Sequence, residues 1–149
     1  MDDQTFREQC KRRGIKITEQ RLAIYKALSG SKDHPTTDAV YRRIKSRYPR
    51  ISFDTVNRTM LTLVDMGLAR LVEGSGGGRC FDPILEPHHH LQCVKCHTII
   101  DFHDQTYDRL RIPKKLPDGF TVLGKIVVLE GLCRKCKPSK GGRTLNPAT

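Results

Sequence analysis

Apolar positions in the first half of the chain recur every three or four residues, the spacing of one face of an α-helix. Three such stretches, separated by capping residues or breakers, predict three helices between residues 18 and 67. Their buried faces are made by Leu22, Tyr25 and Leu28, by Val40, Ile44 and Tyr48, and by Val56, Met60, Leu63 and Val64. Thr18 is suited to cap the first helix and Ser52 or Asp54 the third, while Pro49 and Gly67 are suited to end the second and third.

The pattern then changes to short runs typical of strands. Residues 68–72 and 79–82 flank the glycine-rich run 74–78 and predict a two-stranded hairpin. Three helices followed by a hairpin is the order of a winged helix-turn-helix, in which the third helix enters the major groove of DNA. Two prolines within residues 83–87 then indicate a hinge.

Beyond the hinge the elements are shorter. We expect a strand at 98–102, a helix at 105–110 and one or two strands within 121–129. The end of the chain, from residue 138, has Gly, Pro, Ser and Lys but little apolar content, so we expect it to be disordered.

Size and charge narrow the possible functions. A chain of 149 residues with 37% hydrophobic residues suits one or two small domains, which often need a metal as a staple. Lys and Arg total 27 against 16 Asp and Glu, a formal net charge of +11, which favours a polyanionic partner over a role in solubility alone. Many basic residues fall within the first 60 positions, so we expect the N-terminal half to bind nucleic acid.

The chain start and the cysteines bear on its location. Residues 1–4 are polar, with no apolar stretch behind them and no run of membrane-spanning length, so we expect no signal peptide and no membrane partner. A reducing cytoplasm is the location we expect, and there thiols bind metals more often than they form disulfides.

Four of the six cysteines form two identical pairs, Cys93-x-x-Cys96 and Cys133-x-x-Cys136. A Cys-x-x-Cys turn places two thiolates on one side of a tight loop, and two such turns supply the closed four-sulfur set of a structural zinc site. Disulfides are the alternative that we consider weaker.

Three consecutive histidines precede the first pair. If the run is extended, His88 and His90 point to one face and His89 to the other. His88 and His90, together with His34, Asp82 and Asp101, make a nitrogen- and oxygen-rich set that suits Fe(II), Mn(II), Co(II) or Ni(II). The alternative is a group of exposed histidines with solvated or capping carboxylates.

Both halves of the chain resemble the ferric uptake regulator family. Residues 14–21, His34-Pro35-Thr36, 55–59 and 66–68 are similar to its DNA-binding half. Residues 88–96, 100–102 and 131–136 are similar to its dimerisation half. The similarity extends over about residues 14 to 137, and the motifs agree in order and spacing.

The resemblance implies an α+β fold and a homodimer. An N-terminal winged helix-turn-helix domain would occupy residues 1–82, a hinge 83–87, a zinc-stapled C-terminal α/β dimerisation domain 88–137 and a disordered tail 138–149. It also implies two metals. A structural Zn²⁺ would be held by Cys93, Cys96, Cys133 and Cys136. A regulatory Fe²⁺ or Mn²⁺ would be held by His34, Asp82, His88, His90 and Asp101.

The implied function is that of a metal-dependent transcriptional repressor and not of an enzyme. Aspartate at positions 82 and 101 looks most like the peroxide-responsive branch, in which iron-catalysed oxidation would modify His34 and His88. An iron-responsive repressor without peroxide sensing is the first alternative, and a zinc-responsive one is the second, because Cys80 lies two residues from Asp82. A metalloenzyme and a zinc-ribbon module for RNA or protein are the alternatives from other classes.

The implied partner is double-stranded DNA with an AT-rich inverted repeat as operator. The residues expected to contact it are Lys16, Arg21, Thr55, Asn57 and Arg58. Asn57 stands where the family usually has Tyr, and an asparagine can make a bidentate contact to adenine. The alternative for Asn57 is a phosphate contact or none.

Overall fold

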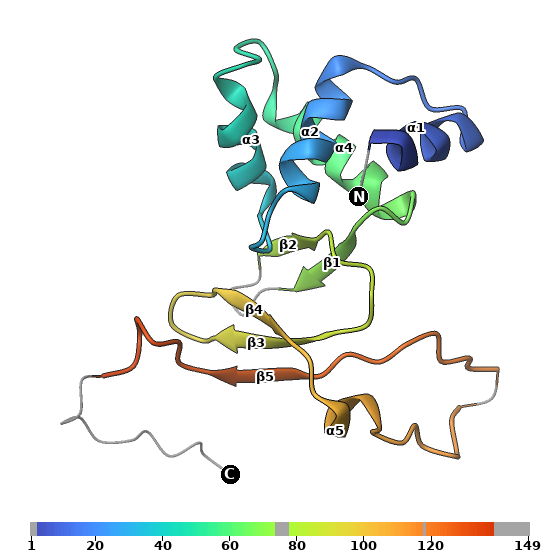
Figure 1. Ribbon diagram of the computed structural model, residues 1–149, viewed down its shortest axis with the longest axis vertical. Coiled ribbons are helices and arrows are strands. Elements are labelled where there is room, and N and C mark those ends of the chain that lie inside the picture. Colours follow the sequence, from blue (N-terminus) through green and yellow to red (C-terminus); the bar gives the residue numbers. More distant parts are fainter. Residues whose placement is uncertain (1–2, 74–77, 118, 139–149) are drawn as a thin grey trace.

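The computed structural model describes residues 3–73, 78–117 and 119–138, and its fold is α+β, as expected. The N-terminal half contains helices α1 (Asp3–Arg12), α2 (Glu19–Ser29), α3 (Thr37–Lys45) and α4 (Phe53–Asp65) and strands β1 (Arg70–Glu73) and β2 (Arg79–Asp82). The C-terminal half contains strands β3 (His89–Cys93), β4 (Ile99–Phe102) and β5 (Val128–Gly131) and the short helix α5 (Gln105–Asp108). Helices α1–α4 lie at one end of the molecule, the β1–β2 hairpin in the middle and the three-stranded sheet with α5 towards the other end (Figure 1).

Side-chain caps begin two helices where the sequence predicts them. Thr18 accepts a hydrogen bond from the backbone N–H of Arg21, and Ser52 accepts one from Thr55, so Ser52 caps α4 rather than the alternative Asp54. Gly67 ends α4 with φ of +70°, and Leu68 N–H bonds back to the Leu63 carbonyl. This left-handed residue closes the helix as glycine does most easily.

Helix α1 was not predicted from the sequence. Only Phe6 and Cys10 of its residues are buried, one turn apart, which is too sparse a pattern to indicate a helix. Phe6 stacks on Tyr25 of α2 with ring centroids 4.9 Å apart. Packing against α2, rather than a periodic pattern of its own, therefore explains why α1 is part of the fold.

One hydrophobic core lies among the four helices and β2. Its best-buried members are each at most 1% exposed: Phe6, Cys10, Ile24, Tyr25, Leu28, Val40, Val56, Met60, Leu63 and Phe81. The predicted apolar faces therefore form this core, although Leu22, Tyr48 and Val64 are only partly buried against it. The second helix ends at Lys45, earlier than Pro49 alone indicates.

The two sheets differ in pairing. Strands β1 and β2 form an antiparallel hairpin, with Arg70 opposite Asp82. In the three-stranded sheet the order is β4-β3-β5, with β4 antiparallel and β5 parallel to β3. The strand predicted within 121–129 begins only at Val128, which pairs with His90 of β3, and continues to Gly131. The helix predicted at 105–110 ends at Asp108.

Backbone bonds hold β2 against the segment before α3. Phe81 N–H donates to the Pro35 carbonyl at 3.0 Å, and Thr36 forms an isolated bridge with Cys80. On the other side of the hairpin, Gln92 of β3 donates to the Glu73 carbonyl at 3.3 Å. The Gln92 bond to the end of β1 therefore links the three-stranded sheet to the hairpin. In the part of the chain that the structure describes, no helix is long and apolar enough to cross a membrane.

Candidate metal centres

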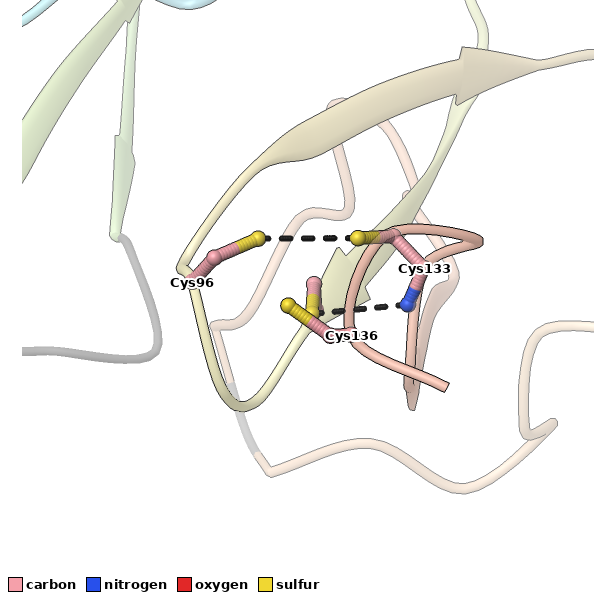
Figure 2. A group of neighbouring side chains, drawn as sticks. Cys96, Cys133 and Cys136 are labelled. Carbon is pink, nitrogen blue, oxygen red and sulfur yellow. Dashed lines mark hydrogen bonds between the residues drawn. The ribbon is translucent and has the colours of Figure 1, made fainter. Parts of the chain in front are cut away.

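The four paired cysteines converge at one end of the three-stranded sheet. Cys96 Sγ lies 3.6 Å from Cys133 Sγ, and the four ligand atoms all lie within 4.8 Å of one another. Figure 2 shows Cys96, Cys133 and Cys136 pointing toward a common centre. Sulfurs bound to one tetrahedral zinc at about 2.3 Å are about 3.8 Å apart, whereas a disulfide requires about 2.05 Å. The cluster is therefore positioned for a zinc site.

The parallel pairing of β3 and β5 brings the two Cys-x-x-Cys turns together. Cys93 ends β3 opposite Gly131, which ends β5 just before Cys133. The backbone N–H of Val94 also donates to the Gly131 carbonyl at 2.9 Å. Because parallel strands end on the same side of a sheet, both turns leave it at one place.

The thiols have opposed protonation preferences. Hydrogen bonds from backbone N–H groups, first that of Cys133 at 3.4 Å, lower the pKa of Cys93 to about 6. The neighbouring Cys96 thiol raises the pKa of Cys136 to about 12. Sulfurs this close cannot all carry negative charge unless a cation compensates them, and a divalent metal does so.

The second cluster draws its side chains from five places. His34 precedes α3, Asp82 ends β2, and His88 lies just before β3. His90 in β3 is the register partner of Asp101 in β4. The structure thus brings together all five residues singled out from the sequence. The strand alternation expected for the histidines also holds, since His89 lies away from this cluster with Nε2 3.1 Å from Asp108 Oδ1.

The donor atoms of the second cluster face one another. His90 Nε2 lies 3.2 Å from His34 Nε2 and 3.0 Å from His88 Nε2. Asp101 Oδ1 lies 3.0 Å from His34 Nε2, and Asp82 Oδ2 lies 3.1 Å from His88 Nε2. Two donors about 2.1 Å from one ion lie about 3.0 to 3.4 Å apart at octahedral or tetrahedral angles. These spacings therefore fit a single cation.

Two carboxylate oxygens support that fit. Asp82 Oδ2 and Asp101 Oδ1 are buried and have no hydrogen-bond partner among the described residues. An anionic oxygen is rarely left so unless a cation compensates it. The other oxygen of Asp82 accepts from Ile84 N–H at 2.8 Å, which fixes the carboxylate.

Protonation also favours metal binding. Burial lowers the pKa of His34, more than Asp101 and Asp82 raise it. Burial acts to raise the pKa of Asp82, but contact with His90 and the Ile84 N–H outweigh it and keep this pKa below its ordinary value. His34 is therefore neutral and Asp82 ionised at neutral pH, the forms in which both bind metals.

The backbone orients His88. Its Nδ1 lies 2.8 Å from the Glu86 carbonyl, so Nδ1 carries the hydrogen and Nε2 presents its lone pair to the cluster. Sequence reasoning missed this contact and the Ile84 contact, because both involve backbone atoms that no side-chain pattern reveals.

The residues expected to contact DNA lie on α4 and at or just before the start of α2. Thr55, Asn57 and Arg58 are in the first two turns of α4, where Arg58 pairs with Asp54 at 2.9 Å. Lys16 and Arg21 lie near the start of α2, joined by a bond of 2.6 Å from the Arg21 guanidinium to the Lys16 carbonyl. Their contacts with DNA stay predictions.

The chain has a winged-helix half joined to a three-stranded sheet. One thiol cluster lies at the sheet and one histidine–carboxylate cluster lies between the halves. These features define a two-site metal-binding protein. Residues 12–123 match the model of the ferric uptake regulator family. The peroxide-responsive repressor of Staphylococcus epidermidis is 33% identical over 125 residues, which are 83% of each chain. The chain belongs to the ferric uptake regulator family, whose members are metal-responsive regulators.

Solved structures agree with this fold. A structure described as a zinc-bound manganese uptake regulator is 30% identical, with a TM-score of 0.68, and the match covers 87% of this chain and 98% of that one. The Helicobacter pylori ferric uptake regulator is 21% identical with a TM-score of 0.73, and the match covers 93% of each chain. At that lower identity the second likeness concerns the fold alone.

Proposed function

We propose that this protein is a homodimeric, metal-dependent repressor of transcription that senses peroxide. The observation that carries the proposal is the histidine–carboxylate cluster, whose donors come from both halves of the chain. His34 of the N-terminal half lies 3.2 Å from His90 of the C-terminal half, Nε2 to Nε2. An ion held there by His34, Asp82, His88, His90 and Asp101 would join the DNA-reading part to the rest of the molecule.

The regulatory consequence follows from this proposed metal link between the two halves. We assign DNA binding to residues 1–82, the hinge to 83–87 and dimerisation to 88–137; the tail predicted at 138–149 lies outside the described residues except for Pro138. In a dimer, the angle between the halves sets the spacing of two α4 helices, which must meet major grooves about 34 Å apart. Metal occupancy therefore stabilises the arrangement that binds an inverted repeat.

An apolar row on the three-stranded sheet supports the homodimer. Ile100, Leu91 and Leu129 are register partners across β4, β3 and β5. They are 47%, 38% and 37% exposed, although the chain carries a net charge of +11. Such a row on a small basic protein is suited to a second copy of the same face.

The choice of metal rests on the donor types. Three imidazoles and two carboxylates without a thiolate favour Fe²⁺ or Mn²⁺, while the four-thiol cluster favours a structural Zn²⁺. Cys80, which left a zinc-responsive protein open, is not part of the metal-ligand group formed by His34, Asp82, His88 and His90. Family membership and metal-binding thiols that must stay reduced support a cytoplasmic location.

Peroxide sensing is favoured over plain iron sensing by the similarity to peroxide-responsive repressors. Fe²⁺ held by these residues would supply electrons for the reduction of peroxide, and the neighbouring imidazoles would then be the groups exposed to oxidation. His34 and His88 are the proposed targets. The alternative is an iron-responsive repressor whose histidines stay unmodified.

A gel-shift assay with an AT-rich inverted repeat tests the proposal. Fe²⁺ and Mn²⁺ should each promote binding, and peroxide should release the DNA only from the Fe²⁺ form. Mass spectrometry should then find added oxygen on the peptides containing His34 or His88. The Mn²⁺ form treated with peroxide is the matched control. Release of the DNA without added oxygen on either peptide would contradict the peroxide mechanism. DNA binding of equal strength with and without metal would contradict the metal-dependent repressor function.

A further inference from the structure

Asn57 on α4 is held by a side chain of another helix. The hydroxyl of Thr37, the first residue of α3, donates to Asn57 Oδ1 at 3.1 Å. Thr37 is 8% exposed, whereas Asn57 is half-buried, so the bond sits at the edge of the α3–α4 packing. The amide carbonyl is therefore turned toward α3.

Asn57 lies beside exposed residues of α4. Asp54 and Arg58, one turn before it and next to it on α4, are exposed and paired with each other. No hydrogen bond to the Asn57 Nδ2 group occurs among the described residues. The two amide hydrogens are thus the part of Asn57 available to a ligand on the exposed side of α4.

We propose that Thr37 is a positioning residue that makes Asn57 a hydrogen-bond donor to guanine in the major groove. This inference rests on the proposed DNA-binding function. An unrestrained asparagine reads adenine with both ends of its amide, accepting from N6 and donating to N7. Because the bond to Thr37 turns Oδ1 toward α3, the amide NH₂ is the end that we expect to meet a base, and guanine offers it two acceptors, N7 and O6. Asn57 therefore selects guanine rather than the adenine expected from the sequence alone.

The segment that carries Thr37 is itself fixed. Pro35 accepts from Phe81 N–H at 3.0 Å, and Thr36 caps α3 by accepting from Ala39 N–H at 3.2 Å. The two residues that precede Thr37 are thus each held by a hydrogen bond. Such anchoring is what a positioning residue needs in order to hold a partner in one orientation.

The chain offers variants that separate positioning from stability. Thr37→Val removes the hydroxyl and keeps the shape, while Thr37→Ser keeps the hydroxyl. Thr59→Val is the matched control, because Thr59 is also a buried threonine near Asn57 in sequence, but its hydroxyl donates to the Thr55 carbonyl at 2.8 Å. Asn57→Ala identifies which operator position Asn57 reads.

The experiment selects sites from a randomised duplex library with the Mn²⁺-loaded protein and measures affinities for all four bases at the position that loses discrimination in Asn57→Ala. Guanine should be preferred by about tenfold over the other bases in the native protein, in Thr37→Ser and in Thr59→Val. In Thr37→Val the preference should fall below about threefold, with unchanged affinity for unrelated DNA. Thermal unfolding checks that the variants are folded.

The outcomes distinguish the two proposals. A preference for adenine, equal selection by Asn57→Ala and the native protein, or full discrimination in Thr37→Val overturns the inference and leaves the repressor function standing. If Thr37→Val does not fold, loss of the guanine preference in Thr37→Ser overturns it instead. Failure of the native protein to bind any duplex with any metal overturns the proposed function, and the inference with it.

Discussion

His34 and Asp101 come from opposite halves of the chain, yet His34 Nε2 lies 3.0 Å from Asp101 Oδ1. The His34 side chain is 3% exposed and that of Asp101 is 22% exposed. Asp101 thus forms the more open edge of the histidine–carboxylate cluster, and His34 is its only donor from the helical part of the N-terminal half. This geometry makes His34 the residue whose loss should separate metal binding from its effect on DNA.

His34→Ala should uncouple metal from DNA binding. Removing one of five donors should weaken Mn²⁺ binding by at least about 100-fold, since even residues that only orient metal ligands are worth about 10- to 100-fold. Calorimetry for the metal and a gel shift for the operator measure the two effects. His97→Asn is the control, because His97 lies outside the cluster and asparagine tolerates its φ of 60°. Unchanged metal-dependent DNA binding in His34→Ala would contradict the proposal that the bound metal joins the two halves.

Zinc removal should affect the two halves unequally. The hydrophobic core lies among α1 to α4 and β2, so a chelator should leave most of the helical circular dichroism. The three-stranded sheet loses the closure at the ends of β3 and β5, and the dimer should dissociate with it. Cys93→Ser should reproduce this result and Cys80→Ser should not, as read by zinc content and by light scattering. Complete loss of the helical signal on chelation would show that the N-terminal helices also depend on zinc, contrary to this prediction.

Leu91→Asp should convert the proposed dimer to a monomer. The change places a charge in the middle of the row Ile100–Leu91–Leu129, where desolvation in an interface is costly. Leu71→Asp is the matched control, since Leu71 is also a strand leucine and is similarly exposed, at 42% against 38% for Leu91. Analytical ultracentrifugation measures the result, and a Leu91→Asp protein that remains dimeric would place the interface elsewhere.

Cys10 should make the fold sensitive to alkaline pH. Burial, only partly offset by Arg21, raises the pKa of the Cys10 thiol above its ordinary value of 9.0. A raised folded-state pKa stabilises the fold below about pH 9, and this contribution is lost as the pH rises through the folded pKa. The difference in unfolding free energy between the native protein and Cys10→Ala should therefore shrink from pH 8 to pH 10. Urea titrations at both values measure it, and a constant difference would argue against the shift.

The sequence predicts much of this fold because its strongest patterns are local. Thr18 and Ser52 cap helices through contacts three residues away, and such contacts are visible in the order of residues. The convergence of the four cysteines also follows from their spacing, since Cys-x-x-Cys turns have few other structural uses. The caps depend on neighbours in the chain, and each Cys-x-x-Cys pair is likewise visible in the local order of residues.

What the sequence did not predict depends on distant or backbone contacts. Helix α1 is stabilised by Phe6 stacking on Tyr25, and β5 is defined by its parallel pairing with the distant strand β3. The orientation of Asn57 depends on Thr37, in a different helix. No local pattern indicates these relationships, since each arises only when separate elements pack together.

Strand β3 carries His90 near its start and Cys93 at its end, so one short ladder supports both clusters. The thiol cluster secures the end of that ladder, and the imidazoles are aligned by the same strand. We therefore expect zinc to be acquired before the regulatory ion can bind its donors. A newly made chain that lacks zinc would be insensitive to its signal, and zinc supply would limit how many copies in a cell are able to respond.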